Sequence, residues 1–133
     1  MSAGRDGPLL AALAAVGLGA VFGAWLRWAL AYWLNPRLEH LPLGTLAANL
    51  IGGYLVGIAV AVFAAHPALP PFWRLLIVTG FLGGLTTFST FSAENVALLG
   101  SGAWGAALLH AGLHLAGSLT ATAVGIASVR AFG

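Results

Sequence analysis

The residues with the most chemical potential lie in one segment, Gly80 to Asn95, which reads GFLGGLTTFSTFSAEN. It combines three glycines, three phenylalanines, several hydroxyl side chains and Glu94 inside an apolar stretch long enough to cross a bilayer. Irregular backbone at membrane depth is tolerated only where it is buried in protein or lines a cavity. We therefore interpret this segment as a site, and as one that handles ions.

The glycines predict a break in a membrane helix near residues 83–87. Each glycine weakens a helix interior by about 1 kcal/mol relative to alanine, and three occur within five residues. Unwound carbonyls at such a break can coordinate a small cation, and the N-termini of half-helices attract anions. The hydroxyl groups of Thr86, Thr87, Ser89 and Thr90 follow as potential hydrogen-bond donors.

Two aromatic residues and one amide add to this pattern. Phe88 and Phe91 are three residues apart, so they project from one helical face. They could simply pack, or their positive ring edges could help to hold a small anion in a dry pore. Asn49, in the second apolar run, could donate its NH2 to the anion or form a hydrogen bond between helices.

Charged side chains within the apolar runs are rare. Arg27 could extend toward the membrane interface. Glu94 lies deeper, which favours a functional or paired role, such as shaping a pore.

The last apolar run carries a polar line on one helical face, whose members follow one another at a spacing of four positions: His110, His114, Ser118 and Thr122. This pattern suggests a track lined by donors. His110 and His114 also have the spacing of metal ligands, and Glu94 is the residue that could join them, so a metal site remains an alternative.

Composition excludes several classes of function. The chain has 133 residues, of which 60% are hydrophobic and 6% charged, and its mean hydropathy is +0.98, so it belongs in a lipid bilayer. The net charge is only +2 and the five basic residues are scattered, which argues against nucleic-acid binding. Cysteine is absent, and no hydrolase or nucleotide-binding motif is present, so we expect no enzyme.

Prolines and polar residues divide the chain into four apolar runs, each longer than the ~20 residues needed to span hydrocarbon. The runs predict one all-α, four-helix membrane domain over residues 1–133, with spans at about 9–34, 43–65, 72–99 and 103–129. Short connections make neighbouring helices antiparallel. The first run is longer than the apolar part of a signal peptide and contains Arg27, so we expect a retained helix.

The arginines hardly bias the orientation in the membrane. Arg5, Arg74 and Arg130 belong to one side of a four-span topology, while Arg37 and the nearby Arg27 belong to the other. So weak a bias permits insertion in both directions and an antiparallel homodimer, but a single orientation set by Arg5 and Arg130 is equally compatible.

Three stretches resemble one known family. GFLGGLTTFSTFSAE closely resembles the signature of the CrcB/Fluc fluoride channels. GTLAANLIGGYLVG resembles the family's second-helix motif, and GAVFGAWLRW its first-helix motif, with Arg27-Trp28 where Arg-Tyr is common. Together the resemblance covers all but the termini and connections.

The resemblance implies a channel that exports fluoride passively from the cytoplasm across the inner (plasma) membrane. It implies an antiparallel, dual-topology homodimer with two fluoride pathways. Phe88 and Phe91 would present ring edges to fluoride, and Asn49 would donate a hydrogen bond. Backbone carbonyls of Gly83 and Thr86 from both subunits would hold a structural sodium ion at the dimer centre.

The same resemblance implies a polar track beside the rings. The track would contain Ser89, His114, Ser118 and Thr122, and we add Thr90 and Glu94 to the predicted pathway and give Arg27 a structural role. His110 stands where some members have tyrosine, which leaves its role open. The alternatives are a small dual-topology multidrug exporter, which would need a glutamate in the first span, and a metal-binding subunit that uses His110 and His114.

Overall fold

The computed structural model describes residues 3–133, which form helices and short connections. Helix α1 spans Ala3–Leu34 and is followed by the 3-10 turn η1 (Asn35–Arg37). Helix α2 spans Leu43–Ala65. The third span contains α3 (Pro71–Arg74), the π-helical stretch η2 (Leu75–Leu82), α4 (Gly83–Leu85) and α5 (Phe88–Gly100), and α6 spans Trp104–Phe132.

Within these residues, four helices are long and apolar enough to cross a membrane: Pro8–Arg37, Leu43–Ala65, Pro71–Gly100 and Trp104–Phe132. Their bounds lie within three residues of those of the predicted spans. The first helix begins earlier than the sequence indicated, at Ala3 rather than after Pro8. A proline so near the start of a helix removes only one backbone hydrogen bond, so it does not stop the helix.

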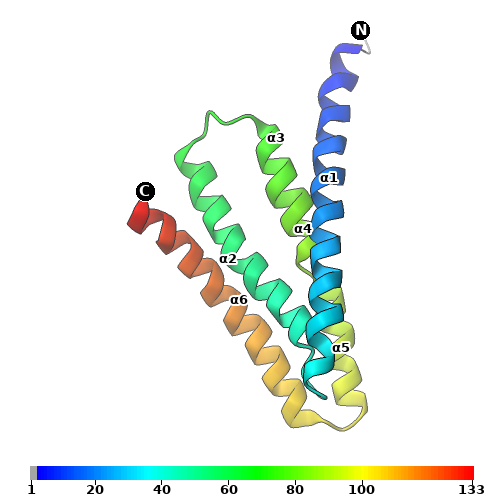
Figure 1. The fold of residues 1–133 in the computed structure, drawn as a ribbon. Coiled ribbons are helices and arrows are strands. Elements are labelled where there is room, and N and C mark those ends of the chain that lie inside the picture. The colour runs from blue at the N-terminus through cyan, green and yellow to red at the C-terminus, as the bar shows by residue number, and fades with distance from the viewer. Residues whose placement is uncertain (1–2) are drawn as a thin grey trace.

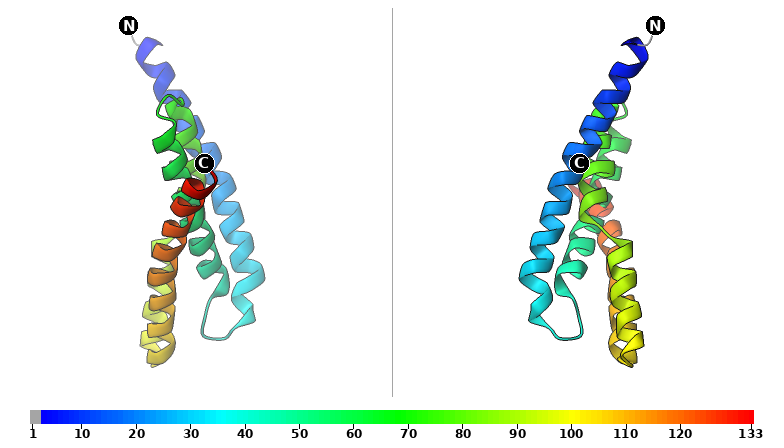
Figure 2. Two further views of the ribbon diagram at one scale, coloured as in Figure 1. Left: turned by 90° about the vertical axis from the view of Figure 1, so that its left-hand side faces the viewer. Right: turned by 90° about the vertical axis from the view of Figure 1, so that its right-hand side faces the viewer.

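Neighbouring spans run antiparallel, as the short connections predicted (Figure 1). The N-terminal end, the α2–α3 connection and the C-terminus lie at one end of the molecule, and the α1–α2 and α5–α6 connections lie at the other. Toward that second end, the α1–α2 hairpin and the α5–α6 hairpin diverge from one another (Figure 2).

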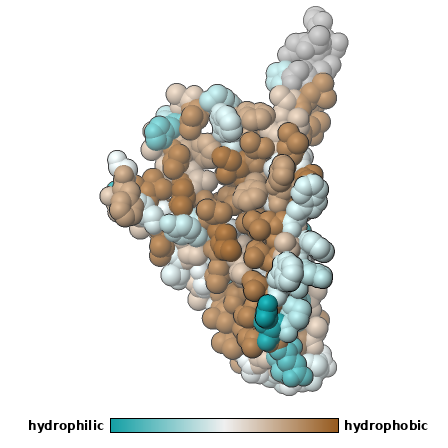
Figure 3. Space-filling model, viewed as in Figure 1, coloured by the Kyte–Doolittle hydropathy of each residue, from teal (hydrophilic) through white to brown (hydrophobic). Residues whose placement is uncertain are grey.

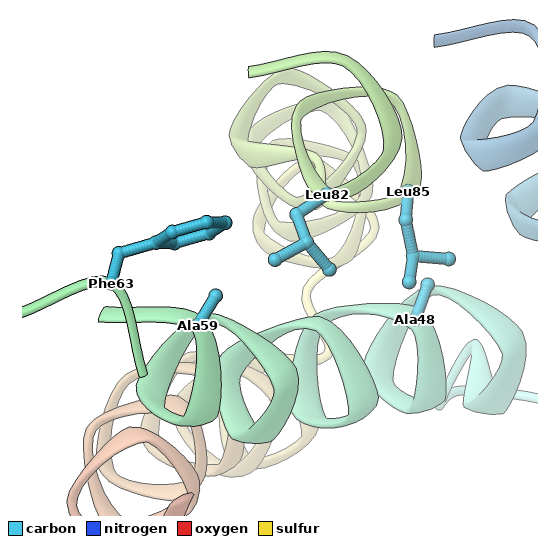
Figure 4. Close-up of a cluster of buried hydrophobic side chains, with 5 residues drawn as sticks. All are labelled: Ala48, Ala59, Phe63, Leu82 and Leu85. Atoms are coloured by element: carbon cyan, nitrogen blue, oxygen red, sulfur yellow. The ribbon is translucent and has the colours of Figure 1, made fainter. Parts of the chain in front are cut away.

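Helix α2 occupies the centre of the bundle. It packs most extensively against α6, while α1 packs against η2 and α4. Ala48, Ala59 and Phe63 of α2 form the buried core together with Leu82 and Leu85, which point toward α2 from the third span (Figure 4). This core fixes the third span against α2 just before the Gly80–Asn95 segment turns polar.

Glycines allow the helix backbones to come very close. A Cβ on Gly80 would lie 2.7 Å from the carbonyl oxygen of Val16 in α1. A Cβ on Gly57 of α2 or on Gly125 of α6 would lie under 3.0 Å from a carbonyl of the other helix. Gly80, which the sequence analysis grouped with the helix break, therefore serves close packing against α1.

The outer surface suits lipid. The face shown in Figure 3 is apolar over most of its helical area. Trp28 and Trp33 of α1 and Trp104 of α6 are exposed near the end that carries the α1–α2 and α5–α6 connections, and Trp73 is exposed near the other end. Tryptophan is enriched where membrane hydrocarbon meets water, so these residues fit the two boundaries of a bilayer.

Candidate functional site

Two residues with extended backbone interrupt the third span. Thr86 has φ −84° and ψ 154°, and Thr87 has φ −152° and ψ 121°. The amide and the hydroxyl of Thr86 both donate to the carbonyl of Leu82, at 3.0 and 2.8 Å. The hydroxyl of Thr87 accepts from the amide of Thr90 at 3.1 Å and so caps the start of α5. Thr86 and Thr87 lie at the end of residues 83–87, the interval in which the sequence predicts a helix break.

Asn49 of α2 forms two hydrogen bonds with the backbone of Thr87, whose amide has lost its helical acceptor. The Thr87 amide donates to Asn49 Oδ1 at 2.8 Å, and Asn49 Nδ2 donates to the Thr87 carbonyl at 3.0 Å. Nδ2 also lies 3.0 Å from Nδ1 of His114 in α6. The structure therefore shows Asn49 hydrogen-bonded between helices. Direct donation to an anion stays a prediction, and it would require Nδ2 to give up one of these partners.

Arg27 stabilises the other side of the interruption. Its Nε donates to the carbonyl of Gly84 at 3.0 Å. In a continuous helix that carbonyl would accept from the amide of residue 88, and the extended threonines prevent this. The half-buried Arg27 side chain therefore contacts α4 inside the bundle.

A cavity of about 580 Å³ lies beside the interruption, between α2, the third span and α6. It gathers predicted site residues that are far apart in the sequence. Those that line it are Asn49, Gly83, Thr86, Phe88, Phe91, His114 and Ser118. The Thr122 hydroxyl lies behind this wall, because it donates to the carbonyls of Gly53 at 3.0 Å and Ser118 at 2.9 Å.

The two phenylalanines have different surroundings. Their ring centroids are 5.6 Å apart. Phe91 stacks on His110 at 5.0 Å and lies 4.6 Å from His114, so it is held between the third span and α6. The Phe88 side chain is 79% exposed in the single chain. Phe91 is thus fixed by its neighbours, whereas Phe88 offers an uncovered aromatic face.

Glu94 is paired. Its Oε2 accepts from the hydroxyl of Thr45 at 2.6 Å, and its Oε1 lies 3.2 Å from Nε2 of His110. On the other side of the imidazole, Asn95 Nδ2 lies 3.0 Å from His110 Nδ1 and donates to the carbonyl of Ala107 at 2.9 Å. A paired role was one of the two that the sequence favoured for Glu94.

Glu94 also lines a second cavity, of about 290 Å³, at the end of the molecule that carries the α5–α6 connection. Glu39 and His40 line the same cavity. Glu94 therefore lies between this outer cavity and His110, and not in the lining of the larger cavity.

Ser89 and Thr90 were also predicted to belong to the pathway, and both contact Thr87 in the third span. Ser89 is exposed, and its hydroxyl lies 3.3 Å from that of Thr87. Thr90 contributes its amide to the cap of α5. Neither residue lines the larger cavity, so their contact with fluoride stays a prediction.

Comparison with known proteins decides the family. The profile of the family described as "CrcB-like protein, Camphor Resistance (CrcB)" matches residues 14–126. The chain belongs to this CrcB family. A relative from Cupriavidus metallidurans is 62% identical over 117 residues, which cover 88% of this chain and 93% of that protein. A relative from Thiobacillus denitrificans is 57% identical over 121 residues, covering 91% and 98%. A third, from Pseudomonas putida, is 57% identical over 120 residues, covering 90% and 94%.

All three CrcB relatives bear the name "Fluoride-specific ion channel FluC". The family resemblance seen in the three sequence motifs is thereby confirmed. With four helices long and apolar enough to span a bilayer, this CrcB protein is a multi-pass membrane protein. The multidrug-exporter alternative is set aside by the family match.

Sequence reasoning missed several residues that organise the site of this CrcB protein. Thr45 is 2% exposed and donates to Glu94, and Asn95 contacts His110. Thr87 was predicted only as a hydroxyl donor, whereas its backbone is the partner of Asn49. The available signal was that a carboxylate buried in a membrane needs donors. The sequence offers many hydroxyl and amide groups, however, and only the packing of α2 and α6 on the third span selects these.

Proposed function

We propose that this chain forms a fluoride-selective channel that passively exports fluoride from the cytoplasm across the plasma membrane. The observation that carries the proposal is the cavity beside Thr86 and Thr87, where the predicted aromatic, amide, imidazole and hydroxyl groups meet. The names of the CrcB relatives support fluoride as the ion.

Selectivity would follow from the kind of donor that the cavity offers. Fluoride is small and strongly hydrated, so a filter must replace its water molecules with close donors. The hydroxyl of Ser118, the amide of Asn49 and the ring edges of Phe88 and Phe91 are of this kind. Chloride is larger, and a path narrow enough for close contact with fluoride would reject it by width.

An antiparallel homodimer would complete two such pathways. In the single chain the Phe88 ring and Gly83 are exposed beside the cavity, where a second copy could cover them. The nearly even distribution of arginines permits insertion in both directions. These two observations support a dual-topology dimer with the helix interruption at bilayer depth.

A structural sodium ion fits the same region. Gly83 is exposed, and a Cβ there would meet only the carbonyl oxygen of Val78, at 3.7 Å, among the described residues. Thr86 has extended backbone, so its carbonyl is freed from the helical pattern. Carbonyls of unwound membrane helices coordinate sodium in other transporters. Gly83 and Thr86 carbonyls would hold the ion, whose positive charge would offset repulsion between fluoride ions.

Fluoride efflux tests the function directly. Purified full-length protein in liposomes loaded with fluoride and chloride should release fluoride rapidly and retain chloride, as read by ion-selective electrodes. Protein that is folded and inserted but releases no fluoride would refute the proposal.

The topology has a separate test, because the chain has no cysteine of its own. Ser101→Cys places one thiol in the α5–α6 connection. A reagent that cannot cross membranes should label about half of the thiols from outside intact cells if insertion is dual. Labelling of all or none of them would show a single orientation.

A further inference from the structure

Two polar side chains stand between the two cavities of the protein. Glu94 lines the outer cavity together with the exposed Glu39 and His40, and its own side chain is 16% exposed. The fully buried His110 lies next to it, with Nε2 3.2 Å from Oε1 of Glu94. Phe91, which lines the larger cavity, stacks on His110. An ion that travels between the two cavities would therefore have to pass Glu94 and His110.

The charge of this pair opposes the passage of an anion. Thr45 donates to Oε2 of Glu94 at 2.6 Å, but a hydroxyl brings no charge. Among the residues whose side chains the structure describes, His110 is the one basic group that forms an ion-pair contact with Glu94. Glu39 adds a second carboxylate to the outer cavity. While His110 is neutral, this end of the route is therefore negative and repels fluoride.

Asn95 determines where His110 carries its proton. Asn95 Nδ2 donates to the carbonyl of Ala107 at 2.9 Å, and its second hydrogen is directed at His110 Nδ1, 3.0 Å away. A neutral imidazole that accepts at Nδ1 has its proton at Nε2, which then donates to Glu94. A metal ion would need the lone pair of Nε2, so this tautomer argues against the metal site that the sequence left open. The nitrogen that can still gain a proton is Nδ1.

Proton uptake at Nδ1 of His110 is coupled to the orientation of the Asn95 amide. An N–H at Nδ1 cannot face the NH2 group of Asn95, because both are donors. Rotation of the amide brings its Oδ1 to the new N–H and gives up the bond to the carbonyl of Ala107. The neutral and the charged imidazole therefore correspond to two discrete arrangements, and the proton concentration biases their equilibrium.

Three other titratable groups face the pair. The ring centroid of His114 lies 4.6 Å from that of His110 in α6, and Glu39 and His40 share the outer cavity with Glu94. Of the three histidines, His110 is the one in ion-pair contact with the Glu94 carboxylate. A positive charge on His110 is therefore the one that cancels the charge of Glu94 at contact distance.

We propose that Glu94 and His110 form a proton-sensitive barrier between the two cavities, and that protonation of His110 lets fluoride pass faster. The inference rests on the channel function proposed above and adds a regulation to it. Histidine ordinarily gains its proton between about pH 8 and pH 5. Even with the screening of water, a unit charge about 4 Å from an ion changes a rate by about fivefold. Fluoride efflux should rise at least that much across this pH range.

Efflux from liposomes at matched internal and external pH tests the barrier. Purified full-length protein should release fluoride at least about fivefold faster at pH 5 than at pH 8. Protein-free liposomes measure the leak of hydrogen fluoride through lipid at each pH, and this leak is subtracted. His110→Tyr keeps an O–H donor for Glu94 but gains no positive charge, so it should lose the response. His40→Gln, the matched control, removes the imidazole of the outer cavity and should keep it.

The protonation of His110 can be read without any functional variant. In lipid nanodiscs, protein labelled with 15N at histidine reports by NMR which imidazole nitrogens carry protons. His110→Tyr identifies the His110 signals among the four histidines. We expect the Nε2–H form at pH 8 and protons on both nitrogens at pH 5. An Nδ1–H form at pH 8, or a His110 that is still neutral at pH 5, would overturn the proposal even if a variant did not fold.

The barrier and the channel function fail in different ways. Liposomes that release no fluoride at any pH overturn the channel itself. Equal release at pH 5 and pH 8 from the unmodified protein, after subtraction of the leak, overturns the barrier alone. A pH response that persists in His110→Tyr also overturns it, because another group would then carry the proton.

Discussion

Replacement of Asn49 by leucine should destabilise the fold more than loss of an ordinary hydrogen bond between membrane helices. Leucine has nearly the same size, so the packing volume changes little. It leaves the amide of Thr87 without a partner, because the extended backbone keeps that amide out of the helical pattern, whereas the Thr87 carbonyl still accepts the first hydrogen bond of α5 as the N-cap. An unsatisfied buried polar group costs about 1–3 kcal/mol, which is the loss that we predict from the Thr87 amide.

Thr122→Val is the matched control. It removes a hydroxyl that donates to the carbonyls of Gly53 and Ser118, and it also keeps the shape of the side chain. Hydrogen bonds between membrane helices average about 0.6 kcal/mol, so this variant should lose less than about 1 kcal/mol. The two variants should differ in stability because, of these two side chains, Asn49 binds a backbone amide outside the helical pattern and Thr122 does not.

The assay is reversible unfolding in mixed micelles, titrated with SDS and followed by circular dichroism. Protein concentration must be equal for all variants, because stability of an oligomer depends on it. Asn49→Leu should lose more stability than Thr122→Val, and every 1.4 kcal/mol changes the unfolding equilibrium about tenfold. If Asn49→Leu is as stable as Thr122→Val, Thr87 has other partners and the reasoning is wrong.

Three further predictions concern the aromatic face, the close helix contact and the buried arginine. Phe88→Ile should lower fluoride efflux from liposomes without loss of folded protein, because the ring is 79% exposed in the single chain and contributes little to its core. Gly80→Ala should lower the free energy of unfolding by about 1–3 kcal/mol, since its Cβ would lie 2.7 Å from a carbonyl oxygen of α1. Arg27→Met should lower it by about 1.5–3 kcal/mol, because the carbonyl of Gly84 loses a charged donor.

Each of these has its own control. Unchanged efflux from Phe88→Ile would exclude the ring-edge role. Gly112→Ala should be neutral or slightly stabilising, because a Cβ there meets no atom within 4 Å among the described residues. If Gly80→Ala and Gly112→Ala changed the free energy of unfolding equally, helix propensity and not close packing would determine the effect of alanine at these positions. Arg27→Lys should retain part of the stability that Arg27→Met loses, and equal stability of all three proteins would mean that the arginine contact is unimportant.

Some local features of the candidate site could be predicted from the sequence because their signals are local. Glycines and threonines around residues 83–87 weaken a helix wherever it lies, and the extended backbone of Thr86 and Thr87 falls within that interval. The four-residue spacing on α6 placed His110 and His114 on one face, and both are buried there with ring centroids 4.6 Å apart. Such patterns depend on the geometry of one helix alone.

The partners of the polar side chains were not predictable in the same way. Asn49, Arg27 and Glu94 were each recognised as unusual, yet Thr87, Gly84 and Thr45 were not identified as their partners. Each of these contacts joins different spans. A helical period shows which residues share a face, but it does not show which face of which neighbour they meet.

The sequence by itself determined four membrane spans, their alternating direction and the family, because apolar length, prolines and motifs are properties of contiguous residues. Tertiary structure alone decided the hydrogen bonding of the interrupted span and the burial of His114. Both depend on how deeply and at what rotation α2 and α6 lie against the third span. The depth and rotation of these helices are set where glycines allow the helix backbones to come into contact. Such contacts form only when the spans pack together.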